Sequence, residues 1–298
     1  MEHRKGVWYG IAAYVLWGLT PIFWKAFDDV PALELLAHRI LWAVPLLALV
    51  VTIRHRWPAL VLIFSAKPTR LLAAGAGTLL TINWGVYVWA VTSGHIVDAS
   101  LGYFINPLVS VALGVIVLRE RLRPAQQVAV GIAAVGVTGM ALMVGTLPWI
   151  SLTLAFSFGL YGLLKKQPAA APPLEGLFAE ISVVALPAFI FLALLASSGE
   201  GSFGGGHATT MLLIAAGAVT VAPLFLFGAS AQRLPLWMVG LLQYIAPTLQ
   251  LLIGVWLYGE AISGGELFGF GLVWIALALF TFDSFRFTRS GRAEQGAV

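Results

Sequence analysis

Cysteine is absent from the 298-residue chain, and its absence excludes disulfide bonds, thiolate chemistry and cysteine-ligated metal sites. The five histidines are scattered along the sequence at spacings that form no metal-binding set. Motifs for zinc proteases, phosphate-binding loops and nucleophilic serines are missing as well. We therefore expect a protein that is not an enzyme and that uses no cofactor and no metal.

Charge is also scarce, because charged residues make up 10% of the chain, whereas soluble domains carry about 25%. Apolar surface replaces it: 60% of the residues are hydrophobic, and the mean hydropathy is +0.93. A soluble fold leaves too much of its surface in water to hide so many apolar side chains. The scattered basic residues form no nucleic-acid surface. The composition predicts an all-α integral membrane protein in contact with the lipid bilayer.

Long apolar runs are abundant, and ten of them approach the roughly 17–25 residues that a bilayer-spanning helix needs. Glycine, proline and charged residues separate the runs, and the sixth run is the shortest. The first run follows a basic N-terminus but lacks a small-residue cleavage site, so we interpret it as a membrane helix rather than a signal peptide. The predicted transmembrane segments are 7–26, 33–53, 71–92, 98–118, 125–144, 148–164, 175–196, 209–231, 235–258 and 264–285.

The basic residues alternate from one connection to the next. All but two of the 17 Lys and Arg residues lie in the two tails or in every second connection, and the exceptions are Lys25 and Arg39. The connections between them carry only acidic charges. The positive-inside rule then predicts that the basic connections and both termini lie in the cytoplasm. The acidic residues of the outer connections are Asp28, Asp29, Glu200 and Glu260.

The second half of the chain repeats the first at an offset of about 140 residues. The segments 103–120 and 243–260 carry Pro, Gly and Glu at identical spacing. Because each half has an odd number of predicted spans, duplication inverts the second half in the membrane. We expect two inverted five-helix repeats, residues 1–145 and 146–298. Such repeats are typical of alternating-access transporters, although duplication alone also makes a stable bundle.

Several motifs resemble the RarD group of the EamA family, in the drug/metabolite transporter superfamily. The resemblance implies ten helices in two inverted repeats around a central cavity. It also implies a secondary transporter of the bacterial inner (plasma) membrane that exports small metabolites or drugs, such as amino acids or chloramphenicol-like compounds. The motifs that carry it are Lys5–Tyr9, Ala13–Gly18, Pro21–Lys25, Pro31–Arg39, Asn83-Trp84 and Gly102–Leu108.

An ionisable side chain inside a span costs about 2.5–3.5 kcal/mol on insertion scales, so each one calls for an explanation. Arg39 has a planar guanidinium that suits a substrate carboxylate, or it forms a structural bridge to Glu34 or Asp98. His38 titrates near neutral pH and is a candidate for proton coupling, or it is a structural histidine. Glu180 is a second proton-coupling candidate, unless it pairs with a lysine at the end of the sixth span.

Aromatic and amide side chains complete the expected site. Trp17 and Trp24 share one face of the first span, either as a cavity wall or as an interfacial belt. The asparagines of the spans are either cavity groups or interhelical hydrogen-bond donors. In the ninth span, Gln243 and Gln250 share a face. The predicted substrate-binding residues are Trp17, Trp24, Lys25, Glu34, His38, Arg39, Asn83, Tyr87, Tyr103, Asn106 and Tyr244.

Two function classes follow from these observations. The first is a secondary transporter, monomeric or homodimeric, with a small-molecule substrate. The second is a membrane channel, or a structural or regulatory membrane protein without transport activity. The inverted repeat favours the first class, because channels usually build a pore from oligomeric symmetry and need no internal inversion.

Overall fold

The computed structural model describes residues 2–27, 30–144, 149–259 and 264–295, and all regular secondary structure within them is helical. The first half contains α1 (Glu2–Trp24), the short 3-10 helix η1 (Lys25–Phe27), α2 (Ala32–Ile53), α3 (Trp57–Ser65), α4 (Lys67–Thr92), α5 (Ile96–Ile116) and α6 (Pro124–Val144). The second half contains α7 (Trp149–Lys165), α8 (Pro173–Ser198), α9 (His207–Ala231), α10 (Leu236–Leu242), α11 (Ile245–Tyr258) and α12 (Gly264–Gln295).

Eight helical segments of the described residues are long and apolar enough to cross a membrane. Two shorter apolar helices, Trp149–Lys165 and Leu267–Phe280, lie where the sequence predicts the sixth and tenth spans. The protein is therefore a multi-pass α-helical membrane protein. The acidic residues predicted in two outer connections, Asp28, Asp29 and Glu260, lie outside the described residues.

The ninth predicted segment, 235–258, is divided into α10 and α11 by a break at Gln243 and Tyr244. The cause is Pro247, which has no N–H and whose ring clashes with the carbonyl of the residue four positions earlier, Gln243. A helix break at membrane depth is tolerated where protein or a cavity surrounds the freed backbone.

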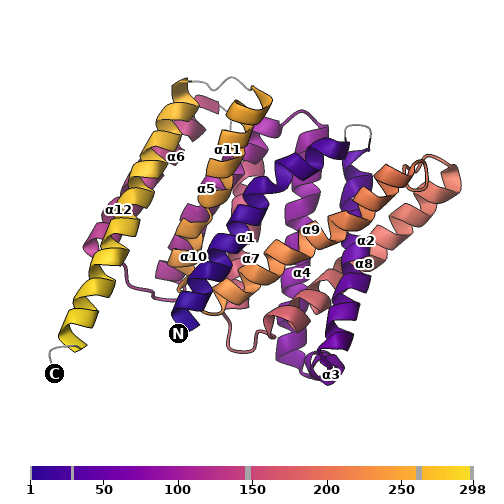
Figure 1. Cartoon of the computed structure of the whole chain (residues 1–298), viewed down its shortest axis with the longest axis horizontal. Coiled ribbons are helices and arrows are strands. Elements are labelled where there is room, and N and C mark those ends of the chain that lie inside the picture. The colour runs from indigo at the N-terminus through magenta and orange to yellow at the C-terminus, as the bar shows by residue number, and fades with distance from the viewer. Residues whose placement is uncertain (1, 28–29, 145–148, 260–263, 296–298) are drawn as a thin grey trace.

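The predicted cytoplasmic connection 54–70 contains an additional helix, α3, that the sequence analysis does not anticipate. Pro58 lies in its first turn, a position where proline favours helix initiation. Its apolar residues are only partly buried, with Leu60 and Ile63 facing the neighbouring helices. In Figure 1, α3 lies at the same edge of the bundle as the N-terminal end of α1 and the C-terminal end of α12.

Four hydrophobic clusters lie among the described residues, and the two largest form the main cores of the bundle. The larger core joins α1, α2, α4, α7, α8 and α9, and the smaller one joins α5, α6, α10 and α12. Figure 1 shows α6 and α12 side by side at one end of the molecule and α2, α4, α8 and α9 at the other. The helices α1, α5, α7 and α11 lie between these two groups, and they supply most of the walls of the site.

Two glycines permit close contact between helix backbones. A methyl group added at Gly77 of α4 would lie 2.6 Å from the carbonyl oxygen of Glu180 in α8. One added at Gly217 of α9 would lie 2.6 Å from the carbonyl carbon of Trp42 in α2. No side chain fits at either distance, so only glycine allows these crossings.

Candidate functional site

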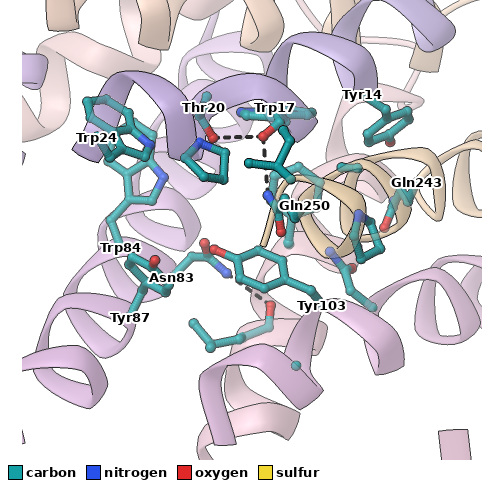
Figure 2. A pocket seen from close by; sticks show the side chains of 18 of the residues that line it. Tyr14, Trp17, Thr20, Trp24, Asn83, Trp84, Tyr87, Tyr103, Gln243 and Gln250 are labelled. Carbon is teal, nitrogen blue, oxygen red and sulfur yellow. Dashed lines mark hydrogen bonds between the residues drawn. The ribbon is translucent and has the colours of Figure 1, made fainter. Parts of the chain in front are cut away.

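A cavity of about 640 Å³ lies where the two cores meet, and Figure 2 shows it from close by. Its walls come from α1, α2, α4 and α5 of the first half and from α7, α9 and α11 of the second. The break between α10 and α11 also opens onto it, through Gln243. A volume of this size is within the range of pockets for small organic ligands, about 300–1,000 Å³.

Aromatic rings form one wall of the cavity, on α1. The ring of Trp17 lies 5.7 Å from that of Phe158 and 5.9 Å from that of Phe227, so α7 and α9 hold it in place. Trp24 lies further along the same helix and also lines the cavity. Both tryptophans of this helix face therefore line the cavity.

Because of Pro21, this wall also contains a backbone carbonyl that the helix does not use, that of Trp17. The missing N–H of Pro21 leaves the carbonyl oxygen of Trp17 without a partner in the helix. Two side chains replace that partner: the Thr20 hydroxyl donates to this oxygen at 2.7 Å, and Gln250 Nε2 donates at 3.2 Å. Figure 2 shows both bonds, and the second one joins α1 to α11 across the boundary between the halves.

Arg39 of α2 reaches the cavity between two indole rings. Its guanidinium carbon lies 5.2 Å from the ring centre of Trp24 and 5.1 Å from that of Trp84. Its Nε donates to the hydroxyl of Thr220 at 3.0 Å. No carboxylate among the described residues forms an ion pair with it.

The two structural bridges considered for Arg39 are not formed. Glu34 instead accepts from the backbone N–H of Ser202 at 2.6 Å and from its hydroxyl at 2.9 Å. Asp98 lies 3.3 Å from Nδ1 of His95, and its backbone carbonyl accepts from Ser151. Neither carboxylate therefore pairs with the guanidinium, and Oδ1 of Asp98 is buried without a hydrogen-bond partner among the described residues.

Lys25 lines the mouth of the cavity at the end of α1. Its ammonium lies 5.5 Å from the ring centre of Tyr258, the last residue of α11, and the side chain is exposed. Together with Arg39 it provides the positive charge of the cavity.

The two asparagines have different environments. Asn83 lines the cavity, and its Nδ2 also donates to the carbonyl of Leu154 at 2.9 Å and to the hydroxyl of Ser157 at 3.0 Å. Asn83 therefore joins α4 to α7 by hydrogen bonds and also faces the cavity. The two alternatives from the sequence, a cavity group and an interhelical donor, both apply to it. Asn106 is buried, and its Oδ1 has no hydrogen-bond partner within the described part of the chain.

Two tyrosines, from α4 and α5, and a glutamine from the break between α10 and α11 also line the cavity. Tyr87 and Tyr103 line the cavity with their rings edge to face, 6.0 Å apart. Gln243 donates from Nε2 to the hydroxyl of Ser110 at 3.1 Å, and its Oε1 is buried without a partner among the described residues. With Asn106, the site thus offers two unpaired side-chain carbonyls.

Three of the predicted substrate-binding residues lie elsewhere. Glu34 and His38 line a separate cavity of about 410 Å³ under the connection between α8 and α9. Phe203 from that connection stacks on the His38 ring at 5.1 Å. Tyr244 is fully buried against α5, where its hydroxyl donates to the carbonyl of Phe104 at 3.3 Å.

Glu180 also lies outside the central cavity. It is 3% exposed, forms an ion pair with Lys165, and accepts a hydrogen bond of 3.0 Å from the hydroxyl of Tyr161. The pairing with a lysine at the end of the sixth predicted span is the alternative that the sequence analysis left open.

Trp84, Phe158 and Thr220 belong to the site but are not among the predicted binding residues. Trp84 directly follows Asn83, but successive residues of a helix point about 100° apart, so the sequence did not indicate that both face the cavity. Phe158 and Thr220 lie in apolar runs of the second half, and nothing in the local sequence distinguishes them from lipid-facing residues.

A multi-pass helical bundle with a polar and aromatic cavity between its halves has the architecture of a membrane transporter. The sequence pattern of the EamA-like transporter family matches residues 4–142. The chain belongs to this family, in its RarD group.

Full-length relatives agree with this assignment. The Protein RarD of Streptomyces exfoliatus is 46% identical and covers 100% of this chain and 94% of its own. The uncharacterized transporter YojE of Bacillus subtilis is 43% identical, with 98% of each chain covered. A solved crystal structure that is 20% identical shares the fold, with a TM-score of 0.72 over 95% of this chain and 99% of that chain.

Proposed function

We propose that the protein is a secondary transporter that moves small amphipathic solutes by alternating access through the central cavity. The observation that carries this proposal is the position of the cavity, whose walls come from both halves of the chain. A solute in such a place is released to one side or the other when the halves change their contacts.

Two inverted five-helix repeats, residues 1–145 and 146–298, are part of the proposal. The support for these repeats is that equivalent helices of the two halves make equivalent contacts. The contacts of α1 with α9 correspond to those of α7 with α4, and those of α2 with α9 correspond to those of α8 with α4. The close crossing of α4 with α8 at Gly77 corresponds to that of α9 with α2 at Gly217. The pattern of the EamA-like transporter family covers only the first of the two halves.

We further propose a location in the bacterial inner membrane with both termini in the cytoplasm. The basic residues of the connections support this orientation. The ends of α1 and α12 and the helix α3 lie at one common edge of the bundle, as an even number of crossings requires (Figure 1). Because the chain contains no cysteine, single cysteines introduced at exposed His55 and His95 can be labelled from one side of the membrane to test it.

Export of metabolites or drugs, including amino acids and chloramphenicol-like compounds, is the direction and solute range that the RarD resemblance suggests. His38 and Glu180 are the proposed proton-coupling groups. Neither lines the central cavity, so coupling would act through the helices α2 and α8 that carry them. Transport that ignores an imposed pH gradient would remove this part of the proposal.

Reconstituted proteoliposomes test the main proposal. Vesicles loaded with unlabelled solute are expected to accumulate labelled solute transiently, because a carrier exchanges one for the other. A saturable counterflow supports a transporter. Unitary conductance steps in a planar bilayer would instead identify a channel, and the absence of both would indicate a structural or regulatory role.

A further inference from the structure

We infer that the solute of the central cavity is a net anion, an organic carboxylate with a planar apolar body, rather than a zwitterion, a cation or a neutral molecule. This inference rests on the proposed transport function, since it concerns the solute that the same cavity receives. It replaces the solute range suggested by the RarD resemblance, because amino acids are zwitterions and chloramphenicol-like compounds are neutral.

The charges that line the cavity are of one sign. Arg39 and Lys25 both face it, and none of the described residues that line it is Asp or Glu. Glu34 and Asp98 do not line this space: Glu34 accepts from Ser202, and Oδ2 of Asp98 contacts His95, while its Oδ1 is buried without a partner among the described residues. A positive charge inside a membrane protein is strongly disfavoured unless an opposite charge or hydrogen-bonding groups compensate it. A carboxylate brought by the solute supplies that compensation.

The guanidinium of Arg39 is held in an orientation that suits a carboxylate. The indoles of Trp24 and Trp84 lie near it, and Thr220 fixes its Nε. Its two terminal nitrogens form no hydrogen bond with any described residue, and the side chain faces the cavity. Four N–H donors are thus available, in the planar arrangement that binds both oxygens of a carboxylate.

The remaining polar groups of the cavity do not favour an ammonium group in the solute. Asn106 Oδ1 and Gln243 Oε1 are buried acceptors without partners in the described structure. A neutral hydroxyl or N–H on the solute satisfies them as well as an ammonium does. An ammonium would also be repelled by Arg39 and Lys25 and would meet no carboxylate among the described lining residues. The aromatic wall, which includes Trp17 and Phe158, packs against a planar body.

Four probes with one phenyl body separate the charge classes: 3-phenylpropionate is an anion, phenylalanine a zwitterion, phenethylamine a cation and 3-phenylpropanol neutral. Their affinities for the purified, unaltered protein are measured by thermal stabilisation in detergent and by quenching of tryptophan fluorescence. We expect 3-phenylpropionate to bind at least about tenfold more tightly than each of the other three. Equal affinities, a preference for another probe, or no binding of the anion would overturn the inference.

The variant Arg39→Gln then tests whether the preference for the anion depends on Arg39. It is expected to lose the preference for 3-phenylpropionate, whereas Arg39→Lys keeps part of it as a point charge. The matched control is Arg54→Gln, which removes an exposed cation outside the cavity and should leave all four affinities unchanged. An anion preference that survives in Arg39→Gln would overturn the assignment. Since the ranking of the probes uses the unaltered protein, the inference stays testable even if Arg39→Gln does not fold.

The outcomes distinguish this inference from the proposed function. Tight anion binding without counterflow in proteoliposomes would argue against transport and leave the charge selectivity standing. Counterflow of phenylalanine or 3-phenylpropanol that is indifferent to Arg39→Gln would leave transport standing and overturn the selectivity.

Discussion

Arg39 and Lys165 are both cations within the helical bundle, but their surroundings differ. Lys165 is 4% exposed and forms an ion pair with Glu180, whose second oxygen accepts from Tyr161. Arg39 faces the central cavity, where two indoles and a hydroxyl contact it and no carboxylate of the described residues pairs with it. The first charge is compensated within the protein, and the second is available to a ligand.

The comparison gives a criterion for charges in membrane helices. An ion pair closed within the core holds helices in register, as Lys165 of α7 and Glu180 of α8 do. A cation surrounded by rings and open to a cavity has a different role, because rings orient it without neutralising it. The following changes test whether the two cations differ in this way.

The largest effect is expected on the closed pair. Lys165→Met leaves the carboxylate of Glu180 buried without its cation, which should lower the free energy of unfolding by about 3–5 kcal/mol. The double variant Lys165→Met/Glu180→Gln removes both charges and keeps an acceptor for Tyr161, so most of the stability should return. Unfolding of the purified protein in detergent measures both. A single variant as stable as the unaltered protein would show that Lys165 is no more structural than Arg39.

A smaller effect is expected from Trp24→Leu, which removes one of the rings beside Arg39. The loss of a cation–π contact should weaken binding of 3-phenylpropionate by about 0.5–2 kcal/mol, because the guanidinium is less well oriented. The same substitution at exposed Trp8, near the start of the same helix, is the control and should leave the affinity unchanged. Equal effects of the two variants would contradict a role for the rings in binding.

The smallest effect is expected from Glu34→Gln. Glu34 precedes Arg39 by five residues in the same helix but binds Ser202 at the separate cavity. Stability should fall by about 1 kcal/mol, since an amide replaces a charged acceptor. Binding and counterflow of 3-phenylpropionate should not change. If the affinity instead falls as it does in Arg39→Gln, the two cavities act as one site.

The sequence located the long apolar helices, but it did not show which face of each helix lies toward the cavity. Apolar length predicted where the long helices lie, because it is a local property of the sequence. The break in the ninth segment is also a local effect, of Pro247. The helix α3 was missed since its apolar residues lie in a connection between two basic clusters.

The candidate site was predictable where polarity alone marks it. Arg39, Asn83 and Asn106 stand out in apolar spans, and all three line the cavity. Glu34 and His38 stand out equally, but successive residues of a helix point about 100° apart, so only packing decides which of them faces inward. Tyr244 turns away from the cavity because the helix is broken beside it.

The carbonyl of Trp17 has a consequence for the movement of the wall between α1 and α11. Pro21 already excludes this oxygen from the helical ladder, so its bond to Gln250 is additional to the secondary structure of either helix. Releasing it disrupts no backbone pairing and, in net terms, forfeits only about 0.5–1.5 kcal/mol, little more than thermal energy. The hydrogen bond between Gln250 and Trp17 therefore joins the two halves at this position but is weak enough for thermal fluctuations to break it.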